Sequence, residues 1–329
     1  MSKHTAFEPR APWWLPGGNA QTIWAALHAR RHDGPPLVWR RERWATPDGD
    51  FVDVDHLEGT TADAPRRLVL FHGLEGTSSS QYAEAFAAVA RARGWAFSVP
   101  HFRGCSGELN LAPRAYHSGD FEEIGWMLGR LRALSGQPLL AVGISLGGNA
   151  LLRWAEEAGD SASATAAAVA AVCSPIDLTA AGRAIDRGFN RQGYARMFLA
   201  TMKPKALAKW RQHPGLFDRE RVRAARTLHQ FDDAFTAPLH GFAGVEDYWR
   251  RASALPHLAR IRIPALVLNT ANDPFVPARS LPPPGRLGAH VTLWRPRQGG
   301  HVGFPQGSFP AQVTAMPTAV SDWLAAAAG

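Results

Sequence analysis

One serine of this sequence lies in a setting that suits nucleophilic catalysis. Ser145 is the centre of Gly143–Ile144–Ser145–Leu146–Gly147, which matches the G-x-S-x-G pattern. A serine hydroxyl becomes a useful nucleophile only when it is exposed and held against a base. A tight turn between a strand and a helix exposes the hydroxyl, and glycines on both sides leave room for such a turn. The pattern therefore predicts that Ser145 is a catalytic nucleophile.

The residues around this pentapeptide predict the strand and the helix that the turn requires. An apolar run precedes it at 139–142, and Leu151, Leu152 and Trp154 follow it at helical spacing. A chance pentapeptide in a glycine-rich chain is the alternative, but it would not come with both of these flanks. The positive end of the helix would also face any oxyanion that forms beside Ser145.

A serine nucleophile needs a base, and the setting of His301 fits this role best. His301 lies in a glycine-flanked loop, 299–304, between the predicted strand 291–294 and the last predicted helix. A flexible loop at this place can carry the base back over the carboxyl edge of a sheet. We therefore predict that His301 is the general base, with a purely structural role as the alternative. His28 and His32 are four residues apart but lack the glutamate of a zinc-protease motif, so no metal site is expected there.

The acid that orients the base is expected directly after an earlier strand. Asp273 follows the predicted strand 265–270 at once and is the predicted acid. Asp177, which follows the predicted strand 166–172, is the alternative, although it suits a helix N-cap better. The resulting order along the chain, serine then aspartate then histidine, differs from the orders in chymotrypsin and subtilisin.

The tetrahedral intermediate of such a reaction needs hydrogen-bond donors where its negative charge develops. The backbone N–H of Leu146, directly after the nucleophile, is one predicted donor. The other is the N–H of Leu74, in the loop 71–76 that follows an early predicted strand. Two alternatives are weaker. His72 as the base would precede the nucleophile, and a phosphate-binding role for this loop lacks the lysine of a P-loop.

The elements that must position these residues alternate between strands and helices over most of the chain. Such alternation predicts a parallel sheet with helices on both faces. It is interrupted where aromatic and basic residues are mixed with weak helical stretches, which predicts one α/β domain over 1–329 with a helical cap inserted at 178–245. The predicted strands are 37–46, 51–57, 67–71, 95–101, 139–144, 166–172, 265–270 and 291–294, and the predicted helices are 20–29, 81–93, 121–134, 146–158 and 311–328.

Composition places the chain among ordinary globular proteins. With 329 residues, 46% of them hydrophobic and 19% charged, it can bury a sizeable core. Its formal net charge is +8 and its basic residues are mostly arginine, which we interpret as a preference for arginine spread over the surface. Nucleic acid or an anionic membrane as a partner is the alternative interpretation.

The cysteines and the apolar runs indicate the cellular compartment in which we expect the protein. Cys105 and Cys173 form no CxxC pair, which favours a reducing compartment and neither a disulfide framework nor a zinc site. The first 16 residues hold three prolines and no apolar stretch, so no signal peptide is expected. The most apolar run, 162–173, is too short to span a bilayer. We therefore expect a cytoplasmic enzyme that inserts into no membrane, binds no nucleic acid and needs no metal or cofactor.

A series of short motifs extends over nearly the whole chain. They are LPGGNAQT at 15–22, HGLEG at 72–76, SSSQY at 78–82, FRGCSGE at 102–108, YHSGD at 116–120, GISLGGNALL at 143–152, TAPLHGF at 236–242, NDP at 272–274 and GGHVGF at 299–304. Each is weak alone, but their order is specific. In this order they resemble the YheT-like hydrolases, a branch of the α/β hydrolases that groups bacterial esterases with eukaryotic lipases of the abhydrolase class.

The resemblance implies an α/β-hydrolase fold with a charge-relay site at Ser145, Asp273 and His301. It also implies carboxylester or monoacylglycerol substrates and no cofactor. Two positions depart from the pattern of these relatives: His101 stands where asparagine is common, and Trp249 where tyrosine is usual. If His101 lines the pocket, it bears on substrate preference.

Together these residues predict hydrolysis of a small-molecule ester through an acyl-enzyme, and the resemblance implies that the ester has a short or medium acyl chain or is a monoacylglycerol. An acyltransferase using the same triad is one alternative. A non-catalytic ligand-binding protein of the same fold is the other. Aromatic residues of the predicted cap suit either an acyl pocket or ordinary helix packing; they are Phe189, Tyr194, Phe198, Trp210, Phe217 and Phe231.

Overall fold

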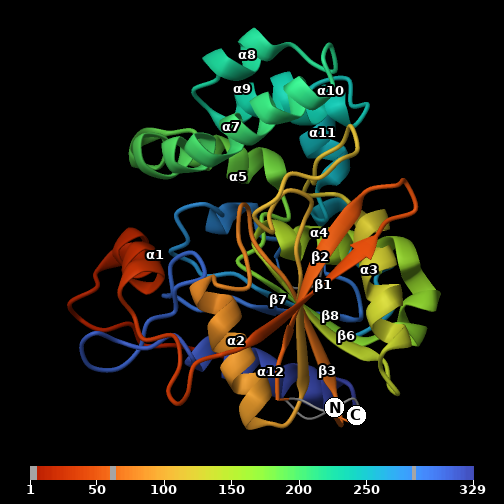
Figure 1. The fold of residues 1–329 in the computed structure, drawn as a ribbon. Coiled ribbons are helices and arrows are strands. Elements are labelled where there is room, and N and C mark those ends of the chain that lie inside the picture. The colour runs from red at the N-terminus through yellow and green to blue at the C-terminus, as the bar shows by residue number, and fades with distance from the viewer. Residues whose placement is uncertain (1–5, 60–63, 284–286) are drawn as a thin grey trace.

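A single eight-stranded sheet forms the centre of the molecule (Figure 1). The computed structural model describes residues 6–59, 64–283 and 287–329. The strands are β1 (Trp39–Ala45), β2 (Phe51–Leu57), β3 (Arg67–Phe71), β4 (Ala96–Pro100), β5 (Leu139–Ile144), β6 (Ala166–Val172), β7 (Ala265–Leu268) and β8 (Val291–Trp294). Their order across the sheet is β1-β2-β4-β3-β5-β6-β7-β8. Strands β3 to β8 are parallel, and β2 pairs antiparallel with both of its neighbours.

Helices cover both faces of the sheet because successive strand residues point to opposite sides. In β3, Leu68 and Leu70 belong to one apolar cluster, whereas Val69 and Phe71 belong to the other. The helices around the sheet are α1 (Gly17–Leu27), α2 (Gln81–Ala92), α3 (Phe121–Ala133), α4 (Leu146–Ala158) and α12 (Ala315–Ala327). The cluster of Leu68 contains side chains of α2 and α12, and the cluster of Val69 contains side chains of α3 and α4. The predicted mostly parallel sheet with helices on both faces is confirmed.

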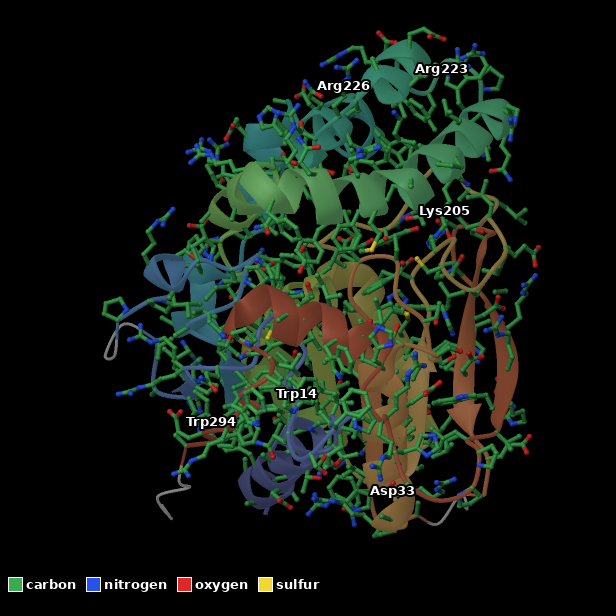
Figure 2. The ribbon with its side chains drawn as sticks, turned by 90° about the vertical axis from the view of Figure 1, so that its left-hand side faces the viewer. Trp14, Asp33, Lys205, Arg223, Arg226 and Trp294 are labelled. Carbon is green, nitrogen blue, oxygen red and sulfur yellow. The ribbon has the colours of Figure 1, made fainter. Side chains whose placement is uncertain are left out.

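Between β6 and β7 the chain leaves the sheet and forms a layer of helices above it, at the top of Figure 1. We call residues 178–252 the helical layer. It has an apolar core of its own that includes Leu199, Phe217 and Phe231. Figure 2 shows Arg223 and Arg226 on its outer side and Lys205 nearer the sheet. The elements of this stretch are α5 (Leu178–Ile185), α6 (Gly188–Asn190), the π-helical turn η2 (Arg191–Ala195), α7 (Arg196–Gln212), α8 (Arg219–Ala224), α9 (Leu228–Phe231), the π-helical turn η3 (Asp232–Thr236), α10 (Ala237–Leu239) and α11 (Val245–Ala252).

Short 3-10 turns complete the fold; they are η1 (Gly159–Ala164), η4 (Leu255–Arg260) and η5 (Ala278–Ser280). The last helix begins at Ala315, later than the predicted start at 311. Ala311 has a φ of 68°, and Gln312 exchanges two backbone hydrogen bonds with Gln306, so this stretch forms a turn. Among the helices of the described ranges, none has the length and apolarity needed to cross a membrane.

Candidate active site

Ser145 occupies a sharp turn between β5 and α4. Its backbone has a φ of 51° and a ψ of −117°, a conformation of a kind that costs roughly 1–3 kcal/mol in residues other than glycine. The backbone N–H of Ser145 donates to the carbonyl of Val172 on β6 at 2.8 Å. The neighbouring strand therefore holds the turn in place, and Ser145 borders a cavity.

The glycines on both sides of Ser145 are required by space. A Cβ at Gly143 would come 2.4 Å from the carbonyl oxygen of Gly147. A Cβ at Gly147 would in turn come 2.4 Å from the carbonyl oxygen of His72. Side chains at either position would push α4 away from β3 and β5. The glycines thus allow the helix to begin directly behind the serine.

Ser145, His301 and Asp273 form a hydrogen-bonded chain. Nε2 of His301 lies 3.0 Å from Oγ of Ser145, and Nδ1 lies 2.9 Å from Oδ2 of Asp273. The Asp273 side chain is fully buried, whereas that of His301 is partly accessible. A neutral imidazole that donates from Nδ1 to the carboxylate presents the lone pair of Nε2 to the serine hydroxyl, which is what a general base requires.

The two candidate acids have different surroundings. Oδ1 of Asp273 accepts hydrogen bonds from the backbone N–H of Phe275 at 2.7 Å and of Val276 at 3.1 Å, which leaves Oδ2 for His301. Asp177 is the N-cap of α5, and its carboxylate accepts from a backbone N–H in the first turn of that helix at 3.0 Å. No hydrogen bond or ion pair joins Asp177 to His301 in the described part of the chain.

Helix α1 positions the loop that carries His301, a role that the sequence did not indicate. Oγ1 of Thr22 accepts the backbone N–H of His301 at 2.8 Å. Oε1 of Gln21 accepts the backbone N–H of Gly299 at 2.8 Å and the side-chain amide of Asn272 at 2.9 Å. Both residues belong to the LPGGNAQT motif. That motif is the only signal in the sequence; the structure adds that Gln21 is 1% exposed.

His72 fixes the loop that carries Leu74. The imidazole is fully buried, and burial lowers its pKa to about 3, so it is neutral. Its Nε2 accepts the backbone N–H of Phe102 at 3.1 Å, which leaves Nδ1 as the donor to the carbonyl of Gly73 at 2.8 Å. The N–H of Gly76 donates to the same carbonyl at 2.9 Å. The Leu74 N–H, on the opposite side of that trans peptide, points away from these contacts.

The backbone amides predicted to bind an oxyanion both border the cavity. Leu74 and Leu146 line it together with Ser145. Within the described residues neither amide donates a hydrogen bond, so both are available to a ligand. Their role in stabilising an oxyanion stays a prediction. His72, with both ring nitrogens engaged, is not placed to take a proton from Ser145.

The cavity has a volume of about 150 Å³ and lies between the helical layer and the loops above the sheet. Helix α7 contributes Phe198 and Met202 to its wall, and the loop after β4 contributes Arg103 and Asn110. Its wall therefore combines apolar side chains of α7 with polar side chains of that loop.

Of the six aromatic residues considered for an acyl pocket, only Phe198 and Phe231 line the cavity. Phe189 is 60% exposed. Tyr194 packs against Phe275, with ring centroids 4.5 Å apart. The remaining two belong to or pack against the core of the helical layer; they are Phe217 and Trp210. For Tyr194, Phe217 and Trp210 the alternative interpretation, helix packing, is right, whereas the exposed Phe189 fits neither interpretation. The cavity has further aromatic walls that the sequence did not indicate: Tyr116, Phe235, Tyr248, Trp249 and Phe275.

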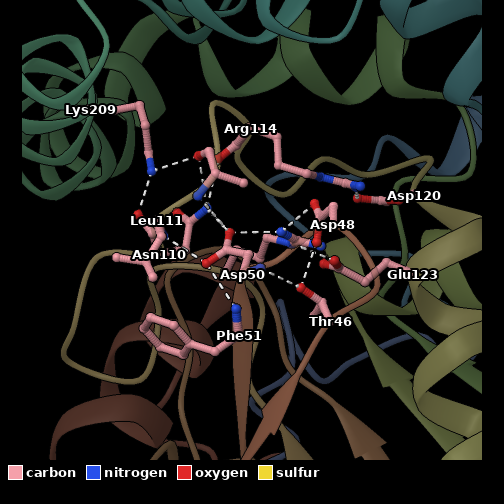
Figure 3. Close-up of polar contacts among 12 residues, drawn as sticks. Thr46, Asp48, Asp50, Phe51, Asn110, Leu111, Arg114, Asp120, Glu123 and Lys209 are labelled. Atoms are coloured by element: carbon pink, nitrogen blue, oxygen red, sulfur yellow. Dashed lines mark hydrogen bonds and ion pairs between the residues drawn. The ribbon is translucent and has the colours of Figure 1, made fainter.

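Polar contacts tie the helical layer to the loop after β4 (Figure 3). Nζ of Lys209 on α7 donates to the carbonyls of Asn110 and Ala112. Burial lowers the pKa of Lys209 to about 8. One lysine of α7 therefore fastens this helix to the loop that forms the polar wall of the cavity.

Asp50, directly before β2, organises the same loop. Its fully buried carboxylate accepts from the side-chain amide of Asn110 at 2.7 Å and the backbone N–H of Leu111 at 2.6 Å. It also accepts from Ala112 at 3.0 Å and pairs with Arg103 at 2.7 Å. Burial alone would raise the pKa of Asp50, but these donors outweigh it and lower that pKa to about 2.

The two positions that depart from the family pattern differ in their relation to the cavity. His101 is 1% exposed, does not line the cavity and donates from Nε2 to Asp55 at 2.8 Å. Trp249 does line it, and its Nε1–H donates to Asp232 at 2.9 Å. Burial raises the pKa of Asp232 to about 6. Of the two departures, only Trp249 contacts the space available to a substrate.

Cys173 lies beside the base and the acid. Its Sγ, a carboxylate oxygen of Asp273 and a ring nitrogen of His301 lie within 4.8 Å of one another, close enough to hold an ion. Metal ligation needs a thiolate, but burial raises the pKa of the Cys173 thiol well above its usual value. Its sulfur accepts the N–H of Val302 at 3.3 Å, and the imidazole and carboxylate already bond each other. These groups do not fit a metal centre.

Comparison with known proteins places this geometry in a family context. A family model described as "alpha/beta hydrolase fold" matches residues 66–308. The chain is 39% identical over 308 residues to "Putative esterase YheT" of Escherichia coli (strain K12), covering 92% of this chain and 89% of that protein. It is 29% identical over 315 residues to "Phospholipase ABHD3" of Homo sapiens, covering 92% of this chain and 75% of that protein.

Solved structures of low sequence identity share the architecture. An esterase of Pyrococcus furiosus superposes with a TM-score of 0.55 at 13% identity, covering 92% of this chain and 98% of that one. A thermophilic esterase of Thermogutta terrifontis gives a TM-score of 0.51 at 16% identity, covering 88% of this chain and 100% of that one. At these identities the likeness concerns the fold alone, and it confirms the α/β-hydrolase fold expected from the sequence.

Proposed function

The chain belongs to the α/β hydrolase fold family, in the branch of the YheT-like hydrolases, and we propose that it is a serine esterase acting through Ser145. Membership in this branch makes it a hydrolase that acts on esters. The observation that carries the finer proposal is the hydrogen-bonded chain from Ser145 through His301 to Asp273. A serine, an imidazole and a buried carboxylate in this order are the parts of a nucleophilic triad.

In the proposed reaction Oγ of Ser145 attacks the ester carbonyl while Nε2 of His301 takes its proton. Asp273 holds the imidazole tautomer and stabilises the imidazolium. The N–H groups of Leu74 and Leu146 bind the oxyanion. His301 then protonates the leaving alcohol, which leaves an acyl-enzyme. Water, deprotonated by His301, attacks the acyl carbon, and the carboxylic acid and free serine are released.

The cavity supports a small or medium acyl group as the substrate's apolar part. Its volume of about 150 Å³ lies below the roughly 300–1,000 Å³ of pockets for drug-sized ligands. We propose that it takes short- or medium-chain acyl esters or monoacylglycerols. We further propose that residues 178–245 act as a cap within one domain of 1–329, because α7 and the loop after β4 both line the cavity.

Covalent labelling tests the nucleophile. The purified protein is treated with a fluorescent fluorophosphonate, which reacts with activated serines, and is assayed with nitrophenyl esters from acetyl to palmitoyl. We expect labelling and hydrolysis by the natural sequence, with the highest kcat/KM among the shorter chains, and neither in Ser145→Ala. Ser161→Ala is the matched control, because Ser161 is an exposed serine that does not line the cavity.

Two outcomes would overturn the proposal. Labelling that persists in Ser145→Ala would move the nucleophile elsewhere. A protein that binds the esters without turnover would be a ligand-binding member of the fold. Product analysis with added alcohols separates a hydrolase from an acyltransferase, because only the latter transfers the acyl group preferentially to the alcohol.

A further inference from the structure

The net charge of the chain is concentrated in one part of the fold. Residues 178–245 contain twelve lysines and arginines and five aspartates and glutamates, a net charge of +7 out of +8 for the whole chain. The rest of the chain holds 24 lysines and arginines and 23 aspartates and glutamates, so arginine is spread along the chain as expected, but its charge is left unbalanced mainly in this segment. These residues belong to the helical layer, whose outer side carries Arg223 and Arg226 in Figure 2.

A groove on this layer is lined by cations and by no acid. It has a volume of about 640 Å³, and its lining residues are Arg191, Gln192, Arg196, Leu199, Ala200, Lys203, Pro204, Ala225 and Arg226. Within the described chain, none of the three arginines forms an ion pair with a carboxylate. Lys203 is held by the carbonyls of Arg223 and Ala225. The groove therefore joins positive charge that forms no ion pair with a carboxylate to a partly apolar floor.

Large apolar side chains stand exposed on the same helical stretch. Phe189 on α6 is 60% exposed and Met197 on α7 is 55% exposed. Arg191 and Arg196 both lie between these two residues in the sequence. Cations next to exposed apolar side chains suit the surface of an anionic bilayer, where guanidinium groups meet phosphates and apolar groups enter the headgroup region. A nucleic acid backbone would pair with the cations but would not bury Met197.

Helix α7 stands between this groove and the active-site cavity. Leu199, Ala200 and Lys203 line the groove, whereas Phe198 and Met202 line the cavity that contains Ser145. A lipid surface in contact with the groove would thus lie one helix away from the candidate nucleophile. A lipid surface in this place would bring ester-containing molecules close to the cavity. A partner that carries no ester would gain nothing from this position, so the proximity favours a lipid surface.

We propose that the groove, with Phe189 and Met197 beside it, docks the protein reversibly on the surface of an anionic phospholipid membrane. The contact is peripheral, because the described helices include none that could cross a bilayer. It is independent of the chemistry at Ser145, and its failure would leave the proposed esterase activity unaffected.

Vesicle binding tests the proposal. Protein carrying Ser145→Ala, which prevents turnover of lipid, is sedimented with vesicles of phosphatidylcholine alone or of phosphatidylcholine and phosphatidylglycerol in equal amounts. We expect binding to the anionic vesicles only, weakening as salt is added. Each arginine near an anionic surface contributes to the free energy of binding. The triple change Arg191→Gln, Arg196→Gln and Arg226→Gln should therefore weaken binding about a hundredfold.

The matched control removes the same charge elsewhere. Arg10, Arg295 and Arg297 are exposed and outside the helical layer, and their change to Gln should leave vesicle binding within about threefold, because surface potential acts within a Debye length. Hydrolysis of a soluble short-chain ester by both triple variants, made with Ser145 intact, shows that they are folded. Equal losses for the two triples would overturn the proposal. Equal binding to neutral vesicles would overturn it, as would groove-dependent binding of a DNA duplex without vesicle binding.

Discussion

Nζ of Lys205 on α7 lies 2.8 Å from Oε2 of Glu75, the residue that follows Leu74 in the loop after β3. Glu75 has a φ of 58°. The Tyr116 hydroxyl donates to its carboxylate at 2.8 Å and accepts its backbone N–H at 3.2 Å. This ion pair joins the helical layer to the loop of a predicted oxyanion donor. We therefore expect the position of α7 to influence the orientation of the Leu74 amide.

We expect Glu75→Gln to lower kcat because the loop loses its contact with α7. Removal of a whole oxyanion donor costs about 10²–10³ in kcat, so a loosened donor should cost roughly tenfold. The KM for a soluble nitrophenyl ester should change by less than about twofold, since the loss concerns the transition state. Steady-state kinetics of the purified variant measures both constants.

A double-mutant cycle tests whether the ion pair itself is responsible. Lys205→Met should resemble Glu75→Gln, and the double variant should lose no more than either single one. Lys203→Met is the control, because Lys203 lies on α7 but contacts carbonyls of the helical layer. Fully additive losses would show that the two residues act independently.

The strained backbone of Ser145 predicts an opposition between stability and activity. Ser145→Gly should stabilise the protein by about 1 kcal/mol, because glycine adopts a φ of 51° without strain. The same change should lower kcat by roughly 10⁴-fold or more. Urea unfolding measures the first effect. Ser145→Ala is the control, with the same loss of activity and no gain in stability. A glycine variant less stable than the alanine variant would contradict the strain argument.

The candidate acids are separated by what each substitution should change. Asp273→Asn should lower kcat by roughly 10⁴-fold, because an amide in place of the carboxylate favours the wrong tautomer of His301. Asp177→Asn should leave kcat unchanged and cost at most about 1 kcal/mol of stability, as expected for an N-cap. Kinetics and urea unfolding of both variants decide the matter. The reverse pattern would make Asp177 the acid.

Thr22 should act as a positioning residue for His301. Thr22→Val keeps the shape of the side chain but removes the oxygen that accepts the His301 N–H. We expect kcat to fall roughly tenfold with little change in KM, because the base loses its alignment with Ser145. Thr22→Ser restores the oxygen and should restore kcat. If serine fails to rescue the activity, the effect of valine comes from packing and the positioning role is wrong.

The candidate triad could be predicted from the sequence because each member lies in the turn or loop that follows an apolar strand. Ser145, Asp273 and His301 come after β5, β7 and β8, and the carboxyl ends of parallel strands meet at one edge of a sheet. Local patterns were sufficient there. They were insufficient for Thr22, whose partner His301 is 279 positions away. Nothing near Thr22 in the sequence indicates that its hydroxyl faces another loop.

Four of the six aromatic residues considered for the acyl pocket do not line the cavity, for a related reason. Helices of the 178–245 segment have more than one buried side, and composition does not say which side faces the cavity and which faces a neighbouring helix. Phe198 and Phe217 are both aromatic, yet one lines the cavity and the other packs in the layer's core. The charge of the segment, by contrast, was available to simple counting over 178–245.

Asp50 gives the protein a stability that depends on pH. Its donors lower its pKa to about 2 in the folded state, against roughly 3.9 in an unfolded chain. Between these values the unfolded state binds more protons, so stability rises with pH through this window. The contribution of Asp50 is therefore complete above the unfolded pKa and is lost as the pH falls through the folded pKa.

We expect Asp50→Asn to destabilise the protein at neutral pH by about 3 kcal/mol, because Arg103 and the amides of 110–112 lose a buried anion. The free energies of unfolding of the variant and the natural sequence should converge as the pH approaches 2. Urea unfolding of both proteins between about pH 2 and 7 measures this difference, and subtraction removes the titration of all other groups. Asp160→Asn, at a side chain that is 96% exposed, is the control and should show no such pH dependence. If the difference in free energy of unfolding between Asp50→Asn and the natural sequence stays constant over this range, the negative charge of Asp50 does not stabilise the loop and Arg103.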